Sequence, residues 1–438
     1  MHRSLPRILP LVVLFGFGAA ACSLFNHKEK PPPPVTKHTA TMDLTPDITV
    51  NALVAMPPGF TPIAGQRPLW LQGNKELALT GTLQGRTEVL GFSGRAYKRV
   101  RLVAADGGPG APDGKIVGLA ASPNGLTLAV AEAVPGRIEI VMRYVISNSG
   151  QNSVASFDGN FRSVSLTWLA PDTLAVGLAG ESGASSAGAG GLYLVHVMGT
   201  VTVKQVKFTC PPSMLVFSPD RRFAVGQGDE RTPPSLFDRN SGKCQQVAVD
   251  GPIRVLGWAP GSAAFLYSTP AGRGHGAGVF RYSIPGAKTQ LIAVSSSAAA
   301  YAGEGVVIAL GNRDLNPRSA ASSPDRRVTA QLASFIPTQG QTLVDTLGIP
   351  TTPAMMMAST MIYAHGFAEL ALQLFVDGPG GPMREIVTFS IADRKAFVLA
   401  SGPARGVVVI GWSPGANNLV IFDGDGTAGA LAVITPAR

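Results

Sequence analysis

One serine lies in the pattern of a hydrolase nucleophile. The residues from Gly411 to Gly415 fit G-x-S-x-G, in which a serine on a sharp turn attacks a carbonyl carbon. The residue after that serine must donate its backbone N–H to the oxyanion, and Pro414 has no N–H. No histidine follows Ser413 to act as its base. We therefore predict no catalytic residue and expect that the protein is not an enzyme.

Residues that ligate metals occur without the spacing of a metal site. His196, His275 and His365 lie far apart in the chain and lack cysteines or carboxylates spaced as a zinc ligand set. The run Asp423–Gly426 reads DGDG, but it lacks the remaining ligands of a calcium loop and is more typical of a hairpin turn. We expect no bound metal and no cofactor.

Two glycine-rich runs and one methionine run could also suggest binding sites. Gly183–Gly191 and Gly272–Gly278 do not follow a strand and open a helix, as a phosphate-binding loop does, so we interpret both as strand connections. Met355–Met357 could form an adaptable binding patch, but such a run is more often part of an inner strand.

The elements that must position these residues are short strands. The stretch from Pro252 to Val294 contains four segments of four to eight apolar, β-branched or aromatic residues, with Pro and Gly only between them. Four antiparallel strands of this length form one blade of a β-propeller.

The same unit recurs along the chain. An apolar strand ends in an aromatic residue, a Ser/Ala-Pro-Asp/Gly/Asn turn follows, and a second apolar strand comes next. The aromatic position or its equivalent recurs at intervals of about 40–50 residues, as expected for propeller blades. One longer interval contains the insertion Asn312–Pro324. The eight positions are Trp70, Ala121, Trp168, Phe217, Trp258, Tyr301, Tyr363 and Trp412.

These turns resemble the repeats of TolB-like and WD-type β-propellers, from about Trp70 to the C-terminus. The predicted fold is all-β, a propeller of about eight four-stranded blades over residues 45–438, with seven blades as the alternative. The last blade has too few strands after Trp412. We expect Asp47–Met56 to supply the missing strand and so close the ring.

The N-terminus has the composition of an export signal. Met1–Arg7 is basic, and Ile8–Ala21 is apolar but shorter than the ~20 residues of a transmembrane helix. Small residues directly before Cys22 resemble a bacterial lipobox. The resemblance implies that residues 1–21 are a lipoprotein signal peptide and that Cys22 is lipidated. The alternative is an ordinary signal peptide cleaved near Ala21, with Cys22 incidental.

Residues 22–44 are predicted to be a tether between the lipid and the propeller. The run Pro31–Pro34 favours an extended chain of ~3.1 Å per residue. By resemblance to Gram-negative lipoproteins, Ser23 after the cysteine favours the outer membrane over the inner. The sequence thus predicts a protein anchored to the membrane through Cys22, on the periplasmic face of the outer membrane.

Cys210 and Cys244 are the only cysteines besides Cys22. An oxidising compartment favours a disulfide. The blade assignment, however, places the two at opposite strand ends, ~15 Å apart, whereas a disulfide needs Cα atoms within about 7 Å. We therefore predict that they do not pair.

An interaction role is the favoured function, and the resemblance to envelope propellers implies a partner in the cell envelope. Of the 438 residues, 45% are hydrophobic and 14% are charged, which is too apolar for disorder, and the net charge of +9 comes without the basic runs typical of nucleic-acid binding. We predict a non-catalytic protein-interaction scaffold in the cell envelope with an envelope protein as partner. The alternatives are a propeller enzyme or carbohydrate-binding protein that uses the central channel, and a purely structural propeller.

Overall fold

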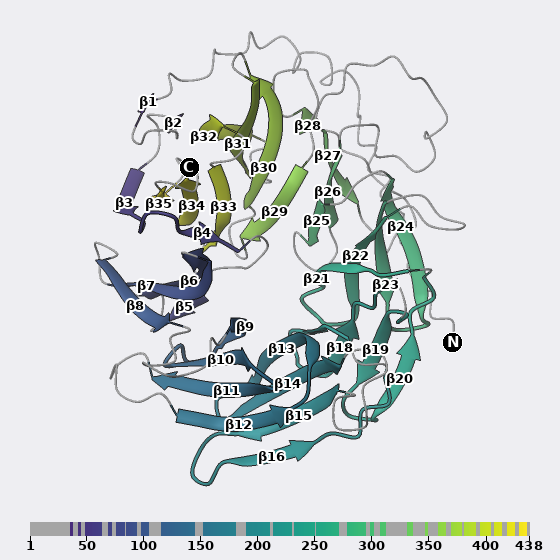
Figure 1. Ribbon diagram of the computed structural model, residues 1–438. Helices are drawn as coiled ribbons and strands as arrows, with labels where there is room; N and C mark the ends of the chain where they lie inside the picture. Colours follow the sequence, from purple (N-terminus) through teal and green to yellow (C-terminus); the bar gives the residue numbers. More distant parts are fainter. Residues whose placement is uncertain are drawn as a thin grey trace, which may run out of the picture.

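Short apolar segments separated by turns form the blades of a propeller in this computed structural model. Its described strands form eight sheets, which follow one another around a ring (Figure 1). Every regular element in this part of the chain is a strand, and it contains no helix that could cross a membrane. The described residues are 36–37, 43–44, 49–63, 69–71, 76–83, 85–93, 98–104, 115–144, 152–180, 190–210, 213–229, 232–249, 251–270, 278–294, 298–301, 307–311, 331–335, 347–348, 358–364, 369–378, 381–390, 395–403, 407–413, 418–424 and 429–435.

The first four blades each place four consecutive strands in antiparallel order from the inside of the ring outward. Blade 1 contains β5 (Leu69–Leu71), β6 (Glu76–Leu83), β7 (Arg86–Ser93) and β8 (Lys98–Ala104). Blade 2 contains β9 (Lys115–Ala121), β10 (Thr127–Val134), β11 (Arg137–Tyr144) and β12 (Asn152–Asp158). Blade 3 contains β13 (Phe161–Ala170), β14 (Thr173–Gly180), β15 (Gly190–His196) and β16 (Thr202–Gln205). Blade 4 contains β17 (Leu215–Phe217), β18 (Phe223–Gly226), β19 (Ser235–Asp238) and β20 (Lys243–Gln246).

The last four blades continue the ring, and the final one is completed from the other end of the chain. Blade 5 contains β21 (Arg254–Trp258), β22 (Ala264–Thr269), β23 (Gly278–Ser283) and β24 (Lys288–Val294). Blade 6 contains β25 (Ala298–Tyr301), β26 (Val307–Gly311), β27 (Gln331–Phe335) and β28 (Leu347–Gly348). Blade 7 contains β29 (Ala358–Ala364), β30 (Glu369–Gly378), β31 (Gly381–Ser390) and β32 (Lys395–Pro403). Blade 8 contains β33 (Val407–Trp412), β34 (Leu419–Gly424), β35 (Gly429–Thr435) and, as its outer strand, β3 (Thr49–Ala55).

The predicted ring closure is confirmed. Strand β3 pairs with β35 along its length, from Thr49 opposite Thr435 to Ala55 opposite Ala430. The Trp70 indole on blade 1 donates a 3.0 Å hydrogen bond to the carbonyl of Trp412 on blade 8. The first and last parts of the sequence therefore hold the ring shut.

The hydrophobic core lies between the blades, because the inner strands bury both faces. Separate clusters of buried residues fill the spaces between neighbouring blades, for example Ile140 with Val176 between blades 2 and 3, and Phe265 with Val225 between blades 5 and 4. All eight predicted repeat positions fall on the innermost strand of a blade, one per blade. The eight-bladed prediction is confirmed, and the seven-bladed alternative is wrong.

Three further short strands belong to the N-terminal part. β4 (Thr61–Pro62) pairs with β6 beyond the end of β5, so that the inner edge of blade 1 is formed in two pieces. β2 (Asp43–Leu44) pairs with β32, and β1 (Thr36–Lys37) pairs with β2. Two pieces of the predicted tether thus lie on the outer edge of blade 7.

Candidate interaction surface

The serine of the G-x-S-x-G pattern has a structural role in a turn. Ser413 is 6% exposed, and its Oγ accepts a 3.1 Å hydrogen bond from the N–H of Asn418. Its own N–H donates to the carbonyl of Asn418 at 2.8 Å. These two bonds close the turn between β33 and β34. Pro414 lies outside the described residues.

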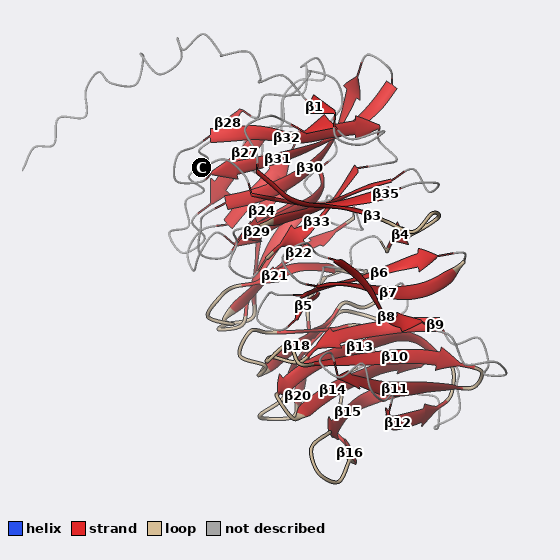
Figure 2. Ribbon diagram, turned by 90° about the vertical axis from the view of Figure 1, so that its left-hand side faces the viewer, coloured by secondary structure: helices blue, strands red, loops and turns tan. Residues whose placement is uncertain are grey.

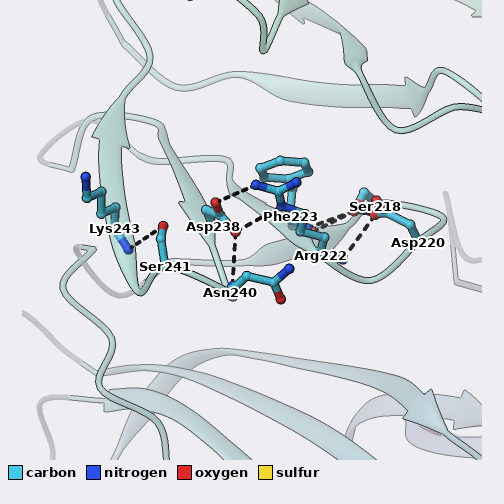
Figure 3. A network of polar contacts seen from close by, with 8 residues as sticks. All are labelled: Ser218, Asp220, Arg222, Phe223, Asp238, Asn240, Ser241 and Lys243. Carbon is cyan, nitrogen blue, oxygen red and sulfur yellow. Dashed lines mark hydrogen bonds and ion pairs between the residues drawn. The ribbon is translucent and has the colours of Figure 1, made fainter.

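The same bonds close the equivalent turn of blade 4. Ser218 Oγ accepts from the N–H of Phe223 at 2.9 Å and donates to the carboxylate of Asp220 at 2.6 Å (Figure 3). Asp220 also accepts from the N–H of Arg222. Burial opposes ionisation of Asp220, but the bonds from Ser218 and Arg222 outweigh it and lower the pKa of this carboxyl group. The Ser-Pro-Asp signature is therefore explained by turn stability.

The remaining polar residues in Figure 3 extend this turn across blade 4. Arg222 forms an ion pair with Asp238 at 3.1 Å and lies over the ring of Phe223, 4.6 Å from its centre. The bond from Arg222 lowers the pKa of Asp238, which also accepts the N–H of Asn240.

Asp238 has its partners within blade 4, whereas Asp220 also contacts Ser262 on the turn between β21 and β22 of blade 5. The N–H of Asp220 donates to Ser262 Oγ at 3.1 Å, and a side-chain hydrogen bond with Ser262 helps to lower the pKa of Asp220. The two carboxylates are therefore balanced by groups of blade 4 and of its neighbour.

A charged cluster on blade 2 is also balanced internally. Glu132 and Glu139 lie opposite each other on β10 and β11. Arg137 forms an ion pair with Glu139 at 2.6 Å, and burial raises the pKa of Glu132 while the charge of Arg143 opposes that rise. The two arginine guanidinium groups thus offset the charge of the two glutamate carboxyl groups, and partly buried charges need such opposite charges nearby.

Among the described residues, the residue types that ligate metals are not gathered into a metal site. His196 lies 3.4 Å from the carboxylate of Asp172, within blade 3, and no described group of three or more His, Cys, Asp or Glu side chains could hold a metal ion. His275 and His365 lie outside the described residues, as do Met355–Met357. Asp423 and Gly424 are the last two residues of β34 and pair with Ala430 and Gly429 of β35, so the DGDG run leads into a hairpin as predicted.

The glycine-rich runs connect paired strands, as predicted. Gly183–Gly191 connects the paired strands β14 and β15, and Gly272–Gly278 connects the paired strands β22 and β23. The described glycines of these runs lie at the starts of strands. Gly190 has φ +87°, and its α-carbon lies close to the backbone of Leu178. A Cβ at Gly190 would be only 2.3 Å from the Leu178 carbonyl oxygen. Glycine is needed there for close packing of the backbone.

The prediction about Cys210 and Cys244 is wrong. They form a disulfide, with Cα atoms 5.2 Å apart. The prediction assumed that the chain passes from blade 3 to blade 4 at the strand ends. Residues 206–210, which we call the strap, instead cross the side of blade 4. Phe208 packs on Phe237 with ring centres 4.9 Å apart, and Cys244 lies opposite Phe237 on β20.

The strap holds the base of an exposed hairpin. The hairpin comprises residues 196–206 and consists of the end of β15, a turn and β16. Met198 is 63% exposed, Val201 40% and Val203 47%, and they are three of the six exposed large apolar side chains in the described part of the chain. All four residues of β16 are exposed. Figures 1 and 2 show the turn extending beyond the neighbouring strands at the bottom of the ring.

A cavity and two lysines lie beside this hairpin. The cavity has a volume of about 520 Å³ and is lined by Gly190, Gly191, Gln205, Val206, Lys207, Phe208 and Cys210. Lys204 and Lys207 are exposed and form no ion pair with another described residue. The segment 182–219 contains no Asp or Glu. The surface therefore combines exposed apolar side chains, a cavity and positive charge.

Sequence reasoning missed this surface. Its signal was the run from Val197 to Phe208, in which valines and a methionine alternate with polar residues. Val197, Val206 and Phe208 pack against the cores between blades, whereas Met198, Val201 and Val203 remain exposed. An outer strand of a propeller faces solvent on its far side, so apolar residues there need a separate explanation.

Three solved structures illustrate what this chain is similar to. The Dos1 propeller has a TM-score of 0.55 to this chain at 12% identity, covering 88% of this chain and 96% of that one. A prolyl endopeptidase has a TM-score of 0.49 at 14% identity over 85% of this chain, which spans about half (54%) of that longer protein. TolB from Acinetobacter baumannii has a TM-score of 0.36 at 11% identity, covering 76% of this chain and 64% of its own.

No known protein family and no curated protein matches the sequence. At such identities, the likeness to the Dos1 propeller shows a shared β-propeller fold.

Proposed function

We propose that this protein is a lipid-anchored β-propeller of the bacterial cell envelope that acts as a non-catalytic scaffold for another envelope protein. The observation that carries the proposal is the exposed hairpin of blade 3, with Met198, Val201 and Val203 in solvent. Burying such side chains against a partner is favourable by about 25 cal/mol per Å² of apolar surface.

The position of the hairpin in the ring supports a partner away from the membrane. Blade 7 carries β2 and β1, which join the tether, and blade 3 is four blades from it in either direction around the ring of eight. Figure 1 shows the two blades on opposite sides. If Cys22 is the anchor, the hairpin lies across the ring from the point where the tether arrives.

The anchor is tested by fractionation. Wild-type protein is expected to sediment with membranes and to leave them only in detergent, because two or more acyl chains hold a protein stably on a bilayer. Cys22→Ala should lose both lipid labelling and the stable attachment, with an unchanged melting temperature as evidence of folding. A folded Cys22→Ala protein that still needs detergent for release would contradict the lipid anchor.

The scaffold role is tested with the hairpin. A double variant, Val201→Thr with Val203→Thr, should lose an envelope partner that wild-type protein retains, whereas Leu126→Thr on the turn between β9 and β10 should keep it. Leu126 is a matched control because it is also exposed, at 38%. A fluorophosphonate label on wild-type protein that disappears in Ser413→Ala would refute the non-catalytic proposal.

A further inference from the structure

We propose that the free edge of β16 receives an extended segment of the partner protein as a fifth strand of blade 3. The partner segment would carry apolar side chains and at least one carboxylate. This inference rests on the proposed scaffold function and specifies how its site works.

The backbone of β16 has hydrogen-bonding groups on its outer edge that no described strand pairs with. The N–H of Val206 donates to the carbonyl of Leu192 at 2.8 Å, and the register continues with Gln205 opposite Tyr193 and Val203 opposite Val195. In an antiparallel ladder, the backbone groups of successive residues point alternately toward the partner strand and away from it. Since Val206 points toward β15, the N–H and C=O groups of Gln205 and Val203 point away from the sheet.

The chain itself shows how such an edge is satisfied. On blade 7, the two residues of β2 pair with Ser401 and Ala400 of β32, so an extended segment from elsewhere in the sequence continues the blade outward. On blade 8, β3 does the same along β35. An outer strand of this propeller can therefore pair with an antiparallel segment from a distant part of the sequence, as a fifth strand on blade 7 and as the fourth on blade 8.

The side chains beside the edge define the chemistry of the added segment. Val203 and Val201 offer apolar surface, and Lys204 and Lys207 offer positive charge in a segment with no acidic residue from 182 to 219. At the start of the hairpin, the carboxylate of Asp172 already has partners within blade 3: it lies 3.4 Å from His196 Nδ1 and accepts a hydrogen bond from the Thr173 hydroxyl. An apolar segment with a carboxylate complements this surface in both respects.

The neighbouring outer strand shows why β16 is selected. β20 has the same length and is also exposed, but its residues are Lys243, Cys244 and two glutamines, with no exposed large apolar side chain. β20 can offer hydrogen bonds, but without apolar burial a strand gains little net stability from them, since water already satisfies the free groups. The cavity beside Gln205 adds room for one partner side chain at β16.

The test uses the full-length, membrane-attached protein with a photo-crosslinking amino acid at position 200, 202 or 205, and mass spectrometry of the crosslinked peptides. Strand addition predicts that the three positions reach one partner segment, at sites that follow one another in order along it. Crosslinks scattered over several segments, or crosslinks to phospholipid, would overturn the inference. If these positions give no protein product but one at Leu126 or Met214 does, the scaffold stands and the β16 edge is wrong. If no position does, both proposals fail.

Two substitutions at one position separate backbone pairing from apolar contact. Val203→Pro removes an outward N–H that does not bond to β15. It should lower the crosslinking yield about tenfold or more, because the pyrrolidine ring of the proline also blocks the approaching strand. Val203→Thr retains the N–H and should reduce the yield much less. Equal yields in the two variants would overturn strand addition.

A charge test covers the case in which Val203→Pro fails to fold. Lys204→Glu combined with Lys207→Glu should lower the crosslinking yield by about tenfold, because like charges then face the acidic partner. Lys243→Glu on β20 is the matched control and should leave the yield unchanged. An unaffected Lys204/Lys207 double variant would contradict the proposed carboxylate.

Discussion

The fourth strands of blade 7 and blade 3 each have an outer edge with backbone groups that need hydrogen-bond partners. In the described part of the chain, only the edge in blade 7 is covered by a further strand. The edge of β32 is covered by β2, and β2 is covered by β1. The edge of β16, on the opposite side of the ring, pairs with no further strand in the described part of the chain and is flanked by exposed valines. An unpaired edge with apolar residues is a hazard that natural proteins usually cover. The chain covers one such edge and leaves the other open, as expected if a partner completes it.

Lys204 disfavours pairing of the open edge with a second copy of itself. Two copies of β16 pairing edge to edge would bring lysines from both chains together, and like charges facing each other across strands are destabilising. A partner segment with a carboxylate instead brings a negative charge to the positively charged lysine. The same residue that protects the edge against another copy of this chain therefore favours an acidic partner.

The largest expected effect comes from uncovering a third edge. Removing residues 45–56 deletes β3 and leaves β35 as the bare outer strand of blade 8. We expect the melting temperature to fall by several degrees, because β3 contributes a full strand of hydrogen bonds and partly buried Val50 and Val54. Thermal unfolding followed by circular dichroism measures this. An unchanged melt would mean that covering this edge is not what holds the ring closed.

The eight blades could be predicted because their signals are local, and the closing strand because the last blade has too few strands after Trp412. Ser-Pro-Asp turns close by bonds between residues five apart, such as Ser218 to Phe223, and the adjoining apolar runs need only be inner strands. The strap and β2 could not be predicted. Their paths depend on which distant surface they meet: residues near Cys210 lie along Phe237, and Leu44 lies beside Ala400. The open hairpin was missed for the same reason, since exposure is a property of the assembled ring.

The second effect concerns the support of the open edge. Cys210→Ser with Cys244→Ser removes a crosslink between positions 34 residues apart, which typically costs about 2–4 kcal/mol of stability. The strap should then loosen, and amide hydrogen exchange should become faster in residues 202–210 than in β32 on the other side of the ring. Equal protection with and without the disulfide would show that packing of Phe208 alone fixes the strap.

A smaller effect is expected on the covered edge. Replacing residues 36–44 with a glycine–serine sequence of equal length keeps the tether but removes β1 and β2. Because only two residues of β2 pair with β32, the melting temperature should fall less than on loss of β3. The bared β32 edge should increase self-association, measured by light scattering. No increase would mean that the cover on blade 7 does not serve to protect an edge.

The smallest effect belongs to the open edge itself, and a cross-strand pair provides the control. Val203 and Val195 lie opposite each other on β16 and β15, but Val203 is 47% exposed and Val195 is 0% exposed. In purified protein without a partner, Val203→Thr should change stability by no more than about 0.5 kcal/mol, as surface substitutions generally do. Val195→Thr should cost about 1–3 kcal/mol, because it buries a hydroxyl group in the core between blades 2 and 3. If Val203→Thr proves as costly as Val195→Thr, the exposed valine already supports the isolated fold, and the reason for assigning it to a partner disappears.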